Sequence, residues 1–283
     1  MISALSKSVT RVMGKSAATP HRRALPAAHR WRRLIGPLFC LALWYVATSF
    51  GWVDVRYVPS PATVAKTLYL WMWASPTGDP YVGTWFMHAG NSVYRVLLGF
   101  FIAAVLGIVI GGLIGWFRLI SDLFDPVLQM LRPVPITSWV PFAVIFFGIR
   151  DASAIFLIAF GAIFPIIVNT AAGVAGTPRA LVRAARMLGI RKHMLLPRVV
   201  IPAALPYIFT GLRLGVGLAW VLVIVAEMLA VKSGLGFAMW DAYYFLRMDI
   251  IIGAMLSVGF LGFLSDLAIK ALSRRALKWS VDV

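Results

Sequence analysis

The stretch GTPRALVRAARMLGIRKHMLLPRVVIPAAL, residues 176–205, separates two long apolar runs and carries the densest charge in the interior of the chain. Thr177 is a good N-cap and Pro178 suits the first position of a helix. Gly189 is the residue type that most readily ends a helix in a left-handed turn. The spacing between them predicts a short helix of about three turns with an apolar face and a basic face. These faces comprise Leu181, Ala185 and Leu188, and Arg179, Arg183 and Arg186, respectively.

Two interpretations of this stretch remain open on its residues alone. It is either an ordinary basic loop on the cytoplasmic side of a membrane protein, or a folded element that docks a soluble partner. A loop that is merely solvated needs neither helix caps nor an apolar stripe, and this one has both.

The composition places the chain in a membrane. Hydrophobic residues make up 61% of it and charged residues 13%, whereas soluble chains average about 45–50% and about 25%. The formal net charge of +17 also fits a nucleic-acid-binding protein, but here the basic residues cluster between the apolar runs. The single cysteine, Cys40, lies inside an apolar run, so it allows no internal disulfide and is expected to be a packing residue.

Six apolar runs approach the roughly 20 residues that a helix needs to cross a bilayer. They are residues 34–50, 92–117, 126–148, 153–174, 205–231 and 250–272. The predicted fold class is therefore an all-α membrane protein with six transmembrane helices.

The regions around these runs complete the predicted organisation. Residues 1–33 hold many Lys and Arg and no acid, which predicts a disordered basic cytoplasmic tail. Residues 34–91 contain the first span and an outer segment whose Trp and Tyr residues, around positions 69–73, predict a helix at the membrane surface. A five-helix core, 92–272, carries the loop 176–204 and a short polar turn at 118–125. Residues 273–283 form a cytoplasmic tail.

Proline interrupts one of these runs, and glycine allows another to pack closely. Pro126 suits the first turn of the third span, while Pro133, Pro135 and Pro141 must interrupt its hydrogen bonds. Broken helices at membrane depth are tolerated against protein or a water-filled cavity, so this span either lines a pore or carries a packing kink. In the second span the spacing of Gly107, Gly111 and Gly115 permits close helix approach, and packing within the chain is favoured over a dimer seam.

The distribution of Lys and Arg predicts the orientation. With the N-terminus inside, the inner segments hold twenty of the 27 basic residues and the outer segments hold five. Cytoplasmic loops carry such an excess, so both termini and the stretch 176–205 are expected in the cytoplasm.

Ionisable residues inside spans are expensive and usually face protein or water. Arg213 is expected either to attract an anion or to form an ion pair or reach lipid phosphate. Arg95 is expected at the membrane interface. The candidate pathway residues are Pro133, Pro135, Asn169, Arg213 and Glu227, and the candidate outer gate is Trp240 and Asp241, with Glu227 near the same mouth. His88 and His193 have no neighbours at metal-ligand spacing, so no metal site is predicted.

One loop pattern resembles a known family. Permease subunits of bacterial ATP-binding-cassette importers carry E-A-A, three residues, Gly, nine residues and I-x-L-P. This chain has Arg183, Ala184 and Ala185, then Gly189, then VVIP ending in Ile201 and Pro202. The segments RPVP at 132–135, WVP at 139–141, PAALPYI at 202–208 and GLGF at 234–237 resemble the nitrate, bicarbonate, cyanate, taurine and alkanesulfonate subgroup. Arg183 departs from the pattern, because it stands where the family has glutamate.

The resemblance implies the type I architecture of an importer permease, which moves a small anion across the inner membrane by alternating access. The coupling loop would comprise Arg179, Arg183, Ala184, Ala185, Arg186, Gly189, Ile201 and Pro202. The partners it implies are a cytoplasmic ATPase that holds ATP and Mg, a second permease copy, an outer substrate-binding protein and membrane lipid. The chain itself would be no enzyme and would hold no cofactor. A secondary transporter or a scaffold without an ATPase are the alternatives.

Overall fold

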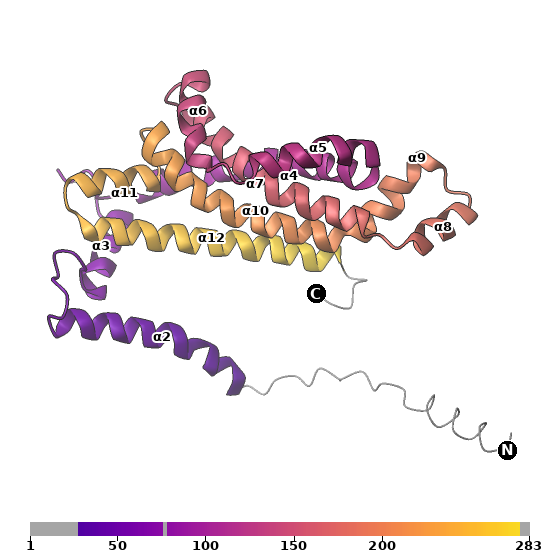
Figure 1. The fold of residues 1–283 in the computed structure, drawn as a ribbon. Coiled ribbons are helices and arrows are strands. Elements are labelled where there is room, and N and C mark those ends of the chain that lie inside the picture. Colours follow the sequence, from indigo (N-terminus) through magenta and orange to yellow (C-terminus); the bar gives the residue numbers. More distant parts are fainter. Residues whose placement is uncertain (1–27, 76–77, 278–283) are drawn as a thin grey trace, which may run out of the picture. The chain divides into compact units, whose positions relative to one another are not determined.

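The computed structural model describes residues 28–75 and 78–277, and the described part is helical with no strand. The chain divides into two compact units, Met1–Trp52 and Val53–Val283. The first contains α2, Ala28–Ser49. The second contains the remaining helices: α3 Pro61–Trp73, α4 Trp85–Trp116, α5 Arg118–Leu131, α6 Val140–Phe147, α7 Asp151–Ala175, α8 Arg179–Met187, α9 Lys192–Leu195, α10 Ile201–Ala230, α11 Leu235–Tyr244 and α12 Met248–Ala276 (Figure 1).

Four helical segments in the described residues are long and apolar enough to cross a membrane. They are Trp85–Trp116, Asp151–Ala175, Lys192–Ala230 and Met248–Ala276. A fifth span is formed if the bent pair Arg118–Leu131 and Ile136–Phe147 counts as one. The apolar part of α2 for which side chains are described, Ile35–Ser49, is shorter. The helical membrane fold is confirmed, while the count of six spans stays a prediction.

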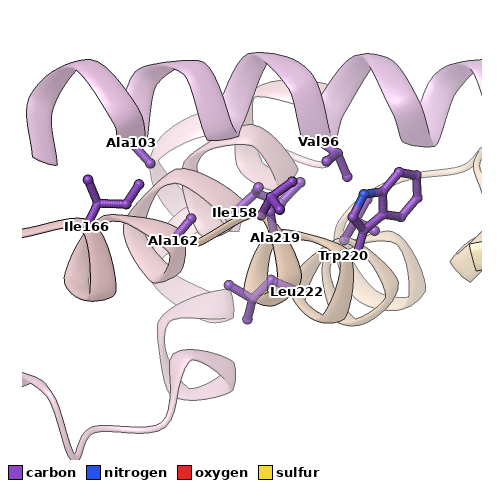
Figure 2. Packing of buried hydrophobic residues seen from close by; sticks show 10 residues of the cluster. Val96, Ala103, Ile158, Ala162, Ile166, Ala219, Trp220 and Leu222 are labelled. Atoms are coloured by element: carbon purple, nitrogen blue, oxygen red, sulfur yellow. The ribbon is translucent and has the colours of Figure 1, made fainter. Parts of the chain in front are cut away.

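The core of the second unit lies where α4, α7 and α10 pack together. Buried branched and aromatic side chains fill this interface, among them Val96 of α4, Ile158 and Ile166 of α7, and Trp220 of α10 (Figure 2). Glycine makes the approach of α4 to α7 close. A Cβ added at Gly111 would lie 2.6 Å from the carbonyl oxygen of Ile167, and one at Gly115 would lie 2.6 Å from that of Ala171. These glycines therefore pack within the chain, as the sequence favoured.

The third predicted span is broken, as expected, but it begins earlier. The polar turn expected at residues 118–125 is instead the first half of α5, with Pro126 inside the helix rather than in its first turn. An amphipathic pattern explains the difference, because a helix with one polar face reads locally as a polar turn. The chain leaves α5 at Arg132, passes Pro133 and Pro135 and continues into α6 at an angle of 94°.

The fifth predicted span also begins earlier, because Lys192–Ala230 forms one helical run. Pro197 and Pro202 do not end it. The turn Leu196–Val200 is π-helical, and such a wide turn tolerates backbone groups that lack their usual partner.

The structure also bears on the expectations for the two terminal regions. The predicted disordered tail lies outside the described residues up to position 27, but its last residues, 28–33, are the first turns of α2. Cys40 is exposed within its unit and is not packed in a core there. The expected surface helix at 69–73 is the end of α3, whose Trp71 is buried and donates its indole N–H to Thr84 Oγ1 at 3.2 Å. At the other end, the predicted tail 273–283 is helical up to Ala276.

Candidate functional site: coupling loop, broken helix and buried charge network

The loop between α7 and α10 folds as a capped helix at one end of the bundle (Figure 1). Gly189 has a φ of +82°, and its N–H donates to Arg186 O at 3.0 Å while the N–H of Ile190 donates to Ala185 O at 3.2 Å. This pair of bonds is the Schellman arrangement that ends a helix at glycine. The N-cap is Pro178 rather than Thr177. Thr177 instead donates its hydroxyl to Gly173 O in the last turns of α7.

The faces of α8 differ from the predicted stripe. Ala185 is buried, but Leu181 is 44% exposed and Leu188 is 83% exposed. Met187, which lies outside the predicted apolar stripe, is 87% exposed. The inner side of the helix is held by Val182, which packs with Val174, Val200 and Ala204. The loop therefore presents apolar side chains outward next to its arginines.

The other residues of the predicted coupling loop frame this helix. Arg179, Arg183 and Arg186 are exposed and line a hollow of about 460 Å³ together with Trp116. Ala184 is exposed, while Ile201 and Pro202 are half-buried in the first turn of α10.

The break between α5 and α6 borders a second hollow, of about 290 Å³, against α7 and α10. Pro133 and Pro135 are exposed at the break. Asn169 of α7 is half-buried on the wall of the hollow and donates from Nδ2 to Pro165 O at 2.8 Å. The structure thus brings the break and Asn169, two parts of the predicted pathway, to one place.

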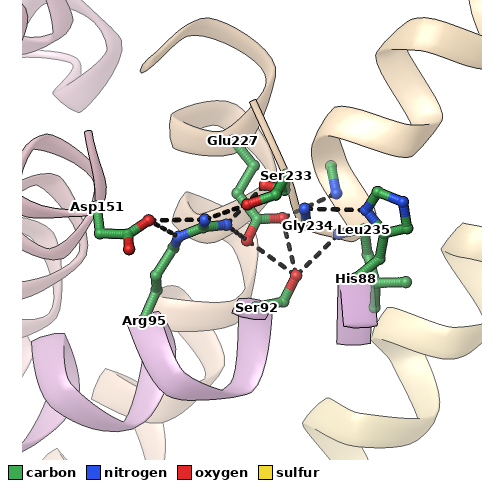
Figure 3. Close-up of polar contacts among 9 residues, drawn as sticks. His88, Ser92, Arg95, Asp151, Glu227, Ser233, Gly234 and Leu235 are labelled. Atoms are coloured by element: carbon green, nitrogen blue, oxygen red, sulfur yellow. Dashed lines mark hydrogen bonds and ion pairs between the residues drawn. The ribbon is translucent and has the colours of Figure 1, made fainter. Parts of the chain in front are cut away.

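Arg213 and Glu227, the charged members of the predicted pathway, have partners elsewhere. Arg213 pairs with Asp266 of α12 through two bonds, Nε to Oδ1 at 2.8 Å and Nη2 to Oδ2 at 3.0 Å. Of the alternatives that the sequence left open, the structure shows the ion pair. Glu227 is fully buried and lies at the centre of a polar network at the opposite end of the bundle from α8 (Figures 1 and 3).

Arg95 is the partner of Glu227, while its expected place at the membrane interface stays a prediction. The side chain is 2% exposed and donates from Nη1 to Glu227 Oε1 at 2.7 Å and to Ser233 O at 2.7 Å. Its Nε donates to Asp151 Oδ1 at 2.8 Å. Burial of an arginine in a membrane helix requires such partners, and they come from α7, α10 and the loop before α11, which no local pattern reveals.

The same network holds the start of α11 in place. Gly234, with a φ of +115°, donates its N–H to His88 Nδ1 at 3.1 Å. Leu235 N–H donates to Ser92 Oγ at 2.9 Å, and Gly236 N–H donates to Glu227 Oε2 at 2.9 Å (Figure 3). These N–H groups have no partner inside their own helix, so side chains of α4 and α10 cap it.

The candidate outer gate residues lie on α11. Asp241 accepts a hydrogen bond from Tyr81 Oη at 2.7 Å, and Trp240 packs against the rings of Tyr243 and Tyr244. Burial, together with Asp241, raises the pKa of the Tyr81 phenol above its usual value. A neighbouring ion pair joins Arg247 to Asp79 at 3.0 Å. The backbone N–H of Tyr81, with help from Arg247, lowers the pKa of Asp79.

No group of three His, Cys, Asp or Glu side chains that would hold a metal is found among residues 28–75 and 78–277.

Residues 81–278 match the family described as binding-protein-dependent transport system inner membrane component. The chain belongs to this family. It is a multi-pass inner-membrane permease subunit of an importer, and the ATPase of such a system is a separate subunit.

Individual relatives agree with this membership. The taurine transport system permease protein TauC of Escherichia coli (strain K12) is 32% identical, covering 86% of this chain and 87% of its own. The nitrate import permease protein NrtB of Synechocystis sp. is 42% identical over 62% of this chain and 64% of its own. A chain of the MetNI methionine ABC transporter, solved in inward-facing conformations, has the same fold, with a TM-score of 0.61 at 17% identity, covering 71% of this chain and 99% of that one.

Proposed function

We propose that this permease carries a small anion inward, driven by an ATPase that docks on the α8–α9 loop. Two copies of the chain would enclose the pathway within membrane lipid, and an outer binding protein would deliver the anion. ATP-driven movement of the loop would switch the spans between outward-open and inward-open states. Family membership makes an independent secondary transporter or a scaffold the weaker alternative.

The observation that carries the docking role is the exposed face of α8. A solvated loop has no reason to be capped at glycine and to hold Met187 and Leu188 in water. An apolar patch beside basic residues is typical of a protein interface. Arg183 stands where the family pattern has glutamate. The proposed docking surface therefore has a positive charge at the position where the pattern has a negative one.

Three features support the direction and the substrate class. The excess of Lys and Arg near α8 and both termini supports a cytoplasmic location for all of them. Arg132 is one of the twenty basic residues counted on the inner side, and it lies at the break between α5 and α6; without it the bias is still nineteen to five. Taurine and nitrate, named for the relatives, are a sulfonate and an oxyanion, which supports a small anion as the cargo.

The test is ATPase activity of the co-expressed complex in lipid with its binding protein and a panel of nitrate, bicarbonate, taurine and alkanesulfonates. Stimulation by one of them would support the proposal. Absence of any ATPase from the purified complex would refute the docking role.

Gly189→Pro should abolish co-purification of the ATPase while leaving membrane insertion normal. Proline cannot adopt a φ of +82° and has no N–H to donate to Arg186 O. Gly189→Asn is the matched control, since asparagine tolerates the left-handed region and keeps its N–H. Equal recovery of the ATPase with both variants would contradict the docking role.

A further inference from the structure

We propose that Arg132 is the cationic residue that binds the transported oxyanion, in the hollow at the break between α5 and α6, with Asn169 as a second donor. This inference rests on the proposed function and assigns its substrate site. It moves the anion-attracting role from Arg213, for which the sequence offered it as one alternative, to Arg132.

Two of the arginines within the spans have carboxylate partners. Arg95 is neutralised by Glu227 and Asp151, and Arg213 by Asp266. Arg132 is different, because its side chain has no hydrogen bond or ion pair with any residue in the described parts of the chain, and it is exposed. An unpaired charge at membrane depth is tolerated when it faces a water-filled cavity or a ligand. Other arginines without a described partner, such as Arg118, Arg198 and Arg274, stand near the ends of their helical segments. Arg132 stands at the break inside the bent pair and is therefore the guanidinium available to a cargo.

Arg132 stands between two hollows. The hollow of about 290 Å³ is lined by Arg132, Phe164, Val168 and Asn169, with Leu214 and Leu218 of α10. Another, of about 470 Å³, is lined by Arg132, Phe164 and Val168 together with Asp125 and Gln129 of α5. The shared residues show that the hollows adjoin at Arg132. Since a water molecule occupies about 30 Å³, either space admits a small hydrated anion.

A polar stripe on α5 leads to Arg132. Asp122, Asp125, Gln129 and Arg132 follow one another at intervals of three or four residues, so they share one face of the helix. The opposite face is apolar and exposed, with Leu119, Leu123, Val127 and Met130. A charge gradient therefore runs along the stripe from carboxylates to the arginine. An anion held at Arg132 meets repulsion at Asp125, which limits how tightly it stays, as transport requires.

The chemistry selects the class of ligand. A guanidinium presents a planar fork of N–H donors that matches the oxygens of carboxylates, phosphates and similar oxyanions. Asn169 uses one of its two N–H donors on Pro165 O, which leaves the other for the ligand. Nitrate, bicarbonate and sulfonates all carry suitably spaced oxygens, whereas a cation or an uncharged solute would leave the arginine unpaired.

The experiment measures uptake of isotope-labelled nitrate and taurine by the full complex in proteoliposomes. Arg132→Gln should lower uptake at sub-saturating anion by about tenfold or more, and Arg132→Lys should fall between it and the wild type, because it keeps the charge and loses the fork. Arg118→Gln, at the other end of α5, is the matched control and should transport like the wild type. Co-purification with the ATPase checks that each variant folds and assembles.

A second readout does not depend on comparing variants. In a Cys40→Ser background, Arg132→Cys should react with an aminoethyl thiosulfonate reagent, which restores a cation, and uptake should recover. A neutral methyl reagent should react without recovery. Wild-type uptake and KM in Arg132→Gln, or no reaction of Arg132→Cys from water, would overturn the site while the proposed function stands. If the wild-type complex moves neither of these two, bicarbonate and alkanesulfonates are measured in the same way, and both proposals fail if the complex moves none of the four.

Discussion

At the scale of single residues, the stability of the fold depends on which charged side chains have partners. Arg95 and Glu227 are buried together, and their bonds connect α4, α7, α10 and the start of α11. Arg56 and Asp54 form an ion pair of the same length, 2.7 Å, but the Arg56 side chain is 86% exposed. Removing one partner should therefore cost more free energy of unfolding at the buried pair than at the exposed pair, because water competes for the exposed pair and not for the buried one.

Glu227→Ala should destabilise the fold by about 3–5 kcal/mol, since it leaves Arg95 buried without its buried carboxylate partner. Asp54→Ala should give no measurable change. The double substitution Arg95→Met with Glu227→Leu should recover part of the loss, because no buried charge is left unpaired. Thermal unfolding of the purified chain in detergent measures all three. Equal effects of Glu227→Ala and Asp54→Ala would show that the network contributes nothing to stability.

At the scale of elements, the contact of α4 with α7 depends on glycine. A Cβ at Gly111 would lie 2.6 Å from Ile167 O and 2.8 Å from Thr170 Cβ, whereas one at Gly217 of α10 would meet nothing within 4 Å. Gly111→Ala should therefore overpack the interface, at a cost of about 1–3 kcal/mol. Gly217→Ala should be neutral or stabilising, because alanine favours helix over glycine by up to about 1 kcal/mol.

Melting temperatures of the two variants check this expectation, with the wild type measured in the same detergent. Both substitutions replace glycine with alanine inside a long helix, so the effect of helix propensity cancels between them. The difference between their melting temperatures then reports the packing. A lower melting temperature for Gly217→Ala than for Gly111→Ala would contradict the close approach of α4 and α7.

At the scale of the whole molecule, the orientation is open to a direct test because Cys40 is the single cysteine. In a Cys40→Ser background, Tyr57→Cys should react with a membrane-impermeant maleimide in intact cells. The Met187→Cys variant, expressed without the ATPase, should react only after the membrane is permeabilised. Tyr57 and Met187 are 66% and 87% exposed, so access to the reagent, and not burial, decides the result. The reverse pattern of labelling would show that the topology is opposite to the predicted one.

Much of the fold was predictable because it depends on local chemistry. Hydrophobic runs mark the long helices, since a bilayer demands about 20 apolar residues. Proline at 133 and 135 marks the break, and Gly189 marks the end of α8. The errors fell at boundaries that depend on amphipathic or proline-containing segments, as in α5 and the start of the helical run at Lys192.

By itself, the sequence determined that this protein is helical, lies in a membrane and resembles an importer permease, because apolar length, glycine and proline act within a few residues of where they stand. The tertiary structure alone decided the partners of the charges. Arg95 pairs across 132 positions with Glu227 and Arg213 pairs across 53 with Asp266, while Arg132 is left without a partner in the described residues. Electrostatic pairing acts through space, so distances along the chain do not reveal it.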